Sequence, residues 1–108
     1  MTQFPCPYLN SEVDLTEERE RHIAENHPDL LPTHKDRIAD TLADPDEIRH
    51  SSRFGNAWLF SRWFDTVRSG KHVVVVAVTD KGPTRRSWIV TAYIARKLVE
   101  GEVEWRRS

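Results

Sequence analysis

Cysteine is almost absent from this sequence, and the common metal and nucleotide motifs are missing altogether. The single cysteine, Cys6, excludes an internal disulfide framework and points to a reducing compartment. The four glycines are scattered, so there is no glycine-rich loop to hold a phosphate. No cysteine pair, HExxH motif or GxSxG motif occurs. The sequence therefore predicts no metal ion and no other cofactor.

Long apolar runs are missing as well. No segment approaches the length needed to span a membrane, and the N-terminal MTQFPCPYLN has none of the features of a signal peptide. We therefore expect no membrane partner and a cytoplasmic location.

The chain has 108 residues, a length that predicts one domain covering 1–108. Its charges are unevenly distributed along this length. Residues 1–48 contain 4 Lys/Arg and 12 Asp/Glu, whereas residues 49–108 contain 12 Lys/Arg and 5 Asp/Glu. This asymmetry has two interpretations. Either the second half presents a basic surface to a partner such as RNA, or acidic helices neutralise a basic sheet within one fold.

The segment Lys71 to Ile94 organises the prediction of secondary structure. His72 to Val78 is nearly continuous valine, and Trp88 to Ile94 is again β-branched and aromatic. The turn-forming residues Asp80 to Thr84 lie between them, which predicts a β-hairpin. Because the valine run does not alternate with polar residues, its strand should be central or covered on both faces.

The remaining segments predict an α+β domain. Thr16 is a suitable N-cap for a helix over Glu17 to Asn26, which His27-Pro28 ends. A second helix is expected from Thr33 to Leu42, with Ile38 and Leu42 facing inward. The expected further strands are 47–52, 57–67 and 102–105, and residues 1–14 are expected to be irregular. The predicted fold is two N-terminal helices packed on a four- to five-stranded antiparallel sheet.

The residue types that remain fit metal-independent cleavage of RNA. That reaction uses the 2′-hydroxyl as nucleophile and needs a base, an acid and cationic donors for the phosphate. Histidine titrates near neutrality, and arginine offers a permanently charged fork. Each candidate also has a plain structural explanation. His22 fits an exposed helix residue, His27 a helix cap, Arg62 a stacked and paired side chain, and Thr91 with Tyr93 an ordinary half-exposed strand face.

The order of several segments resembles a known nuclease family. LTEERERHIAENHPDLL is followed by IADTLADPDEI, WLFSRWF, KHVVVVAV and IVTAYIARKLVEGEVEW. This series, from about Leu15 to Trp105, resembles the phage-type branch of the barnase–EndoU–colicin–RelE-like (BECR) nucleases. The resemblance implies two N-terminal helices before a four-stranded antiparallel sheet, and a metal-independent ribonuclease associated with phages or toxins. Glu20 departs from the pattern, because the family often has an aromatic residue there.

The resemblance also implies a set of site residues. His22, or alternatively His27, falls on the position of the general base or acid, and Arg62 on that of the phosphate clamp. Thr91 would help to bind the phosphate, and Tyr93 would position a base or the scissile group. Lys71 is a further electrostatic candidate, near Tyr93 if the strand register allows it. The expected partners are RNA and a cognate antitoxin or immunity protein; the alternative function is a non-catalytic RNA- or protein-binding module of a toxin–antitoxin or phage system.

Overall fold

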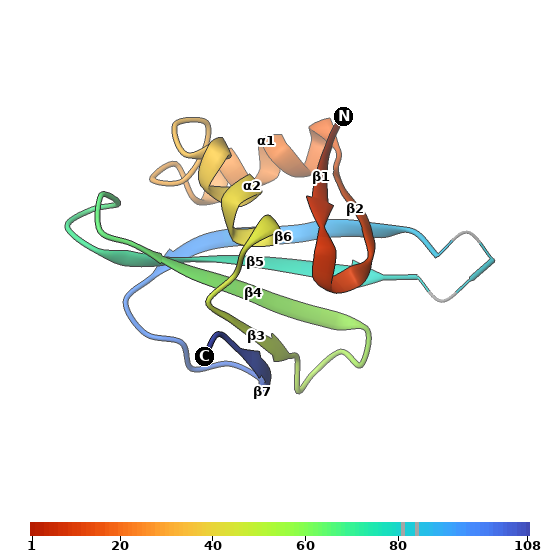
Figure 1. Ribbon diagram of the computed structural model, residues 1–108. Helices are drawn as coiled ribbons and strands as arrows, with labels where there is room; N and C mark the ends of the chain where they lie inside the picture. The colour runs from red at the N-terminus through yellow and green to blue at the C-terminus, as the bar shows by residue number, and fades with distance from the viewer. Residues whose placement is uncertain (81, 84) are drawn as a thin grey trace.

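In the described residues, 1–80, 82–83 and 85–108, seven strands form one mixed sheet with two α-helices on one of its faces (Figure 1). This computed structural model orders the strands β1-β2-β6-β5-β4-β3-β7. The strands are β1 (Thr2–Cys6), β2 (Ser11–Leu15), β3 (Glu47–His50), β4 (Ala57–Phe64), β5 (Lys71–Thr79), β6 (Ser87–Ala95) and β7 (Glu102–Arg106). The helices are α1 (Glu17–Asn26) and α2 (Lys35–Ala43).

The expectation of two N-terminal helices on a four- to five-stranded antiparallel sheet is wrong in its sheet. Residues 1–14, expected to be irregular, contain the hairpin β1–β2, and β2 pairs in parallel with β6. The two prolines concealed an alternating pattern in which Phe4 and Cys6 face the core. Pro5 is tolerated because β1 is an edge strand, where a missing N–H breaks no ladder.

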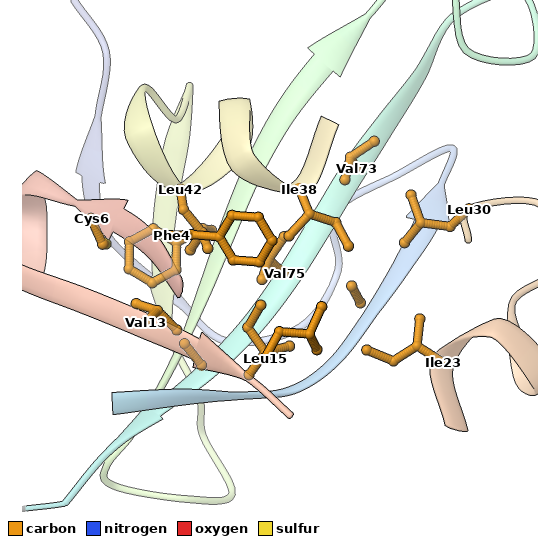
Figure 2. Close-up of a cluster of buried hydrophobic side chains, with 14 of the residues drawn as sticks. Phe4, Cys6, Val13, Leu15, Ile23, Leu30, Ile38, Leu42, Val73 and Val75 are labelled. Carbon is orange, nitrogen blue, oxygen red and sulfur yellow. The ribbon is translucent and has the colours of Figure 1, made fainter. Parts of the chain in front are cut away.

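The valine strand β5 is the middle strand of the sheet, as its composition predicts. On one face Val73, Val75 and Ala77 are fully buried. Figure 2 shows Val73 and Val75 beneath Ile38 and Leu42 of α2, beside side chains from β1 and β2. The sheet and the helical layer therefore share one hydrophobic core.

Local signals determine the helix boundaries. The Thr16 side chain accepts a hydrogen bond from the Arg19 N–H (3.2 Å), which confirms the predicted N-cap. α1 ends at Asn26, as predicted from the His27-Pro28 step. The second helix begins two residues later than expected, at Lys35, because His34 takes the N-cap position. None of the described helices is long and apolar enough to cross a membrane.

The second face of the sheet, directed away from α1 and α2, is called the outer face below. The connection 96–101 between β6 and β7 contributes to hollows on this face, and Leu98 lines one of them together with Ser61 and Val74. β5 and β6 pair as the predicted hairpin, with a bulge between Val76 and Ala77. Part of the predicted turn, at positions 81 and 84, lies outside the described residues.

Candidate functional site

The two helix histidines occupy different environments. His22 is exposed on α1 and lies beside a shallow, highly charged hollow formed by its own helix. The Asn26 side-chain amide donates to the His22 carbonyl oxygen (2.8 Å). His27 is the C-terminal cap of α1, and its ring centroid lies 6.1 Å from that of Tyr93. Of the two histidines, only His27 lies beside another predicted site residue.

Arg62 is stacked and paired with neighbouring protein groups. Its Nη1 donates to the Asp44 carbonyl oxygen (3.0 Å) and to the Asp44 carboxylate (3.3 Å). Its guanidinium carbon lies 5.5 Å from the centroid of the Phe64 ring, the distance of a cation–π contact. Arg62 therefore ties β4 to the C-terminal end of α2.

The strand register separates Arg62 from the predicted hydroxyl pair. Arg62 is opposite Val73 of β5, whereas Tyr93 is opposite Val74, and Thr91 is opposite Val76. Neighbouring residues of a strand point to opposite faces. Arg62 therefore lies on the helix-covered face, and Thr91 and Tyr93 lie on the outer face. The predicted convergence of His22, Arg62 and Thr91 is not formed.

Lys71 also lies on the face opposite to Tyr93. It is paired with Phe64, and the neighbouring pairs are His72 with Ala95 and Val73 with Ile94. Its Nζ donates to the carbonyl oxygens of Arg68 (2.9 Å) and Gly70 (3.1 Å). The placement of Lys71 near Tyr93 depended on a register that the hairpin does not adopt.

The outer face instead gathers another polar group, here called the outer strip: Glu47, Arg49, Ser61, His72, Tyr93 and Arg106. Glu47, Ser61, Val74 and Tyr93 are directly opposite one another across β3, β4, β5 and β6. Three of these four neighbouring strands therefore place a polar side chain in one row, and Val74 of β5 lies between Ser61 and Tyr93.

Glu47 is held by two arginines at one end of the outer strip. Arg49 Nε donates to its carboxylate at 2.7 Å, and Arg106 Nε donates at 2.9 Å. Burial opposes ionisation of Glu47, but these hydrogen bonds outweigh it, so the pKa of Glu47 is lowered. The carboxylate is charged at neutral pH and keeps both guanidinium groups at the outer face.

His72 lies beside this ionic group and is accessible. It lines a hollow of about 360 Å³ together with Ser61, Glu47 and Arg106. Its ring meets the edge of the Trp63 ring, with centroids 5.0 Å apart. Partial burial lowers the pKa of His72, against the opposing effect of Asp46 and Glu47. The imidazole is therefore mostly neutral at pH 7 and able to accept a proton.

Tyr93 completes the outer strip at the β6 end. Burial, together with the charge of Glu100, raises the pKa of Tyr93, so its phenol keeps its proton. The residue lines two adjoining hollows of about 190 and 200 Å³, and Thr91 lines the second. His72 and Tyr93 are diagonal neighbours on one face, which places their Cα atoms roughly 7–8 Å apart.

Sequence reasoning missed His72, Arg49 and Glu47. Alternation along each strand was the available signal, because Glu47 and Arg49 are two residues apart and must share a face. His72 shares a face with Val74 for the same reason. Strand order, which brings β3 within reach of β5, is not visible in the sequence.

The arrangement is not typical of a metal centre. Across the part of the chain that the structure describes, no three His, Cys, Asp or Glu side chains are grouped so as to hold a metal ion. What the outer strip can do is transfer a proton through His72 and hold an anion through its arginines.

Comparisons with known proteins add no family to this description. The chain matches no protein-family model, no curated protein and no solved structure.

Proposed function

We propose that this protein binds single-stranded RNA on its outer face and cleaves it without a metal ion, with His72 as the general base. The observation that carries the proposal is the outer strip, where an accessible histidine of lowered pKa lies beside Arg49 and Arg106. The reaction class is the one expected from the sequence. The residues differ, because His22 and Arg62 lie away from the outer face.

The proposed reaction uses the RNA as its own nucleophile. His72 accepts the proton of the 2′-hydroxyl while the 2′-oxygen forms a bond to phosphorus. The bond from phosphorus to the 5′-oxygen breaks, and the Tyr93 phenol donates a proton to that oxygen. Arg106, whose side chain is 65% exposed, stabilises the charge that develops on the phosphate. The products are a 2′,3′-cyclic phosphate and a 5′-hydroxyl.

Aromatic and basic groups support RNA as the ligand. Trp63, 44% exposed, shares the outer face with His72 and offers a ring for base stacking. Residues 49–108 also carry the excess of Lys/Arg over Asp/Glu. Part of that charge is matched within the fold, because six of these arginines form ion pairs with acidic residues of 1–48: Arg49, Arg62, Arg68, Arg86, Arg106 and Arg107. The association with phages or toxins, and with an antitoxin or immunity protein, is proposed on the BECR resemblance alone.

A second candidate is RNA binding without cleavage. The charge of Glu47 is already matched by Arg49 and Arg106, and that ion-pair network also acts as a structural link between β3 and β7. Such a network favours a fixed, positively charged binding face as readily as a catalytic one.

The test is cleavage of a 5′-labelled single-stranded RNA in EDTA, followed on a denaturing gel. We expect products ending in a 2′,3′-cyclic phosphate, and no cleavage of the same strand in 2′-deoxy form. His72→Ala should lower the rate by about 10²–10⁴-fold. His34→Ala is the matched control, because His34 caps α2 on the helix side and should leave the rate unchanged.

Each other outcome has a defined meaning. Cleavage that persists in His72→Ala but disappears in His22→Ala would assign the general base to His22 of α1. Binding of the 2′-deoxy strand without cleavage of RNA would support the second candidate. Failure to retain RNA at low salt would overturn both candidate functions, since the affinity of a basic surface for RNA phosphates is highest at low salt.

A further inference from the structure

A second hollow, of about 660 Å³, lies at the end of the sheet where the β1–β2, β3–β4 and β5–β6 connections meet. Leu9, Asn56, Asp80 and Arg85 from these connections contribute to it, and Trp58 of β4 forms part of its wall. Trp58 lies on the helix-side face, because it pairs with the buried Ala77 and is two residues from the buried Phe60, so that all three side chains share one face. The hollow is therefore separate from the outer strip.

Trp58 is held in one orientation by its neighbours. The His50 ring stacks on it with centroids 4.4 Å apart and an interplanar angle of 19°. Tyr8 meets it edge-on, with centroids 6.0 Å apart. His50 is itself fixed, since its Nε2 donates to the Gly55 carbonyl oxygen (2.6 Å) and its Nδ1 lies 3.5 Å from the Glu104 carboxylate. The Trp58 and His50 rings both line the hollow. Because they are fixed in this way, they lose little conformational entropy when a ligand packs against them.

The polar groups around Trp58 include both donors and acceptors. The Asn56 amide donates to the Thr79 carbonyl oxygen (3.4 Å) and also presents its own oxygen. One Asp80 oxygen accepts the Gly82 N–H (2.9 Å), which fixes the carboxylate at the hollow. Arg85 supplies a guanidinium. The Asp80 carboxylate and the Arg85 guanidinium carry opposite charges, so the hollow has no excess charge of either sign. A planar ring with donors and acceptors on its edge matches this set of groups.

We propose that this hollow binds a nucleobase, with the stacked rings of Trp58 and His50 as its aromatic wall, Asn56 and Asp80 reading the edge of the base, and Arg85 near the phosphate. The base belongs either to a free mononucleotide or to one unpaired residue of an RNA strand. The inference does not rest on cleavage at the outer strip, because the two sites lie on opposite faces of the sheet.

The indole N–H resonances of the ¹⁵N-labelled native protein provide the first test. AMP, GMP, CMP and UMP are titrated separately, with ribose 5-phosphate and inorganic phosphate as controls. We expect at least one nucleotide to shift the Trp58 resonance saturably while the Trp63 and Trp105 resonances stay in place. If no nucleotide shifts Trp58, a short RNA oligonucleotide is titrated next. A shift with RNA alone identifies the strand as the source of the base, and no shift with either overturns the proposal.

Substitutions at the rim provide the second test. Arg85→Gln should weaken nucleotide binding about three- to fivefold, the size expected for an exposed charge contact. Arg53→Gln is the matched control, because Arg53 is exposed on the β3–β4 connection and does not line the hollow. Equal shifts with ribose 5-phosphate and with every nucleotide would show that only the phosphate is bound, which would also overturn the proposal.

Discussion

At the scale of single residues, Gly70 shows how closely the backbone and an aromatic ring approach each other. Its φ is +101°, and a Cβ at this position would lie 2.6 Å from Cζ2 of Trp63. The left-handed backbone and the close ring each exclude a larger residue. Because Trp63 also meets the His72 ring, Gly70 helps to set the wall of the proposed site.

Gly70→Ala should therefore lower the free energy of unfolding by about 1–3 kcal/mol, through backbone strain and displacement of the Trp63 ring. Urea unfolding followed by far-UV circular dichroism measures the change. Gly55→Ala is the control, because a Cβ at Gly55 meets no atom within 4 Å and its φ needs no glycine. Equal stabilities of Gly70→Ala and Gly55→Ala would contradict the close packing at Gly70.

Glu47 makes the free energy of unfolding depend on pH in the acid range. Its pKa in the folded protein lies below the ordinary value of 4.5, so the charged form stabilises the fold. That contribution is complete above 4.5 and is lost as the pH falls through the folded pKa.

Glu47→Gln should accordingly destabilise the protein by about 1–3 kcal/mol at pH 7, since it weakens charge-assisted hydrogen bonds from Arg49 and Arg106. The difference from the native protein should shrink as the pH falls below 4.5, because the Glu47 carboxyl then becomes protonated in the unfolded and finally in the folded protein. Denaturant unfolding at a series of pH values tests this. A difference that stays constant with pH would show that the charge of Glu47 contributes nothing.

At the scale of elements, local signals in the sequence were reliable and long-range pairing was not. Thr16, the His27-Pro28 step and the valine run each act on their own neighbourhood, and the corresponding boundaries of α1 and the central position of β5 were predicted correctly. The pairing of Val13 with Ser87 joins segments far apart in the chain, and no local pattern indicates it. The mixed sheet was missed for this reason.

The arrangement of the predicted site residues depends on the same long-range pairing. The sequence around Arg62, Thr91 and Tyr93 does not reveal which face of the sheet each strand presents to the helices. A shift of one residue in register reverses every side chain of a strand. The pairing of Val73 with Ile94 places Lys71 and Arg62 on one side and Tyr93 on the other.

The β1–β2 hairpin should contribute substantially to stability although it was expected to be irregular. Phe4 is 5% exposed and lies within the core, among side chains of β2 and α2 (Figure 2). Phe4→Ala should lower the free energy of unfolding by about 3–5 kcal/mol, as for other buried aromatic residues. Pro5→Ala, on the solvent side of the same edge strand, should change it by less than about 0.5 kcal/mol. Chemical denaturation compares the two, and similar small effects would mean that β1 is not part of the core.

At the scale of the whole molecule, the sheet presents two chemically different faces. One face is covered by α1 and α2, and it carries the apolar core. The outer face carries the ionic group around Glu47, the histidine of lowered pKa and half-buried valines such as Val76 and Val78. Proton transfer on that face should follow the protonation of His72.

The rate of RNA cleavage should therefore rise with pH to a plateau, with its midpoint below the ordinary histidine value of 6.5, because burial lowers the pKa of His72. Initial rates between pH 4.5 and pH 8 in a constant-ionic-strength buffer measure the profile. Glu47→Gln removes one of the carboxylates that raise this pKa, so the midpoint should move to lower pH. A profile with its midpoint above 6.5, or one unchanged in His72→Ala, would assign the base to another group.

The pairing of Val13 with Ser87 also has a consequence for how the protein is made. During translation the first fifteen residues leave the ribosome long before the strand that receives them has been synthesised. Until Ser87 and Trp88 emerge, β2 lacks the strand with which it pairs, and the core residues of the β1–β2 hairpin lack part of their cover. Pairing between segments so far apart in the chain slows folding. Until it occurs, apolar side chains stay exposed and can be bound by chaperones. Nascent chains stalled before Ser87 should accordingly remain protease-sensitive at their N-terminus, whereas released full-length chains should not.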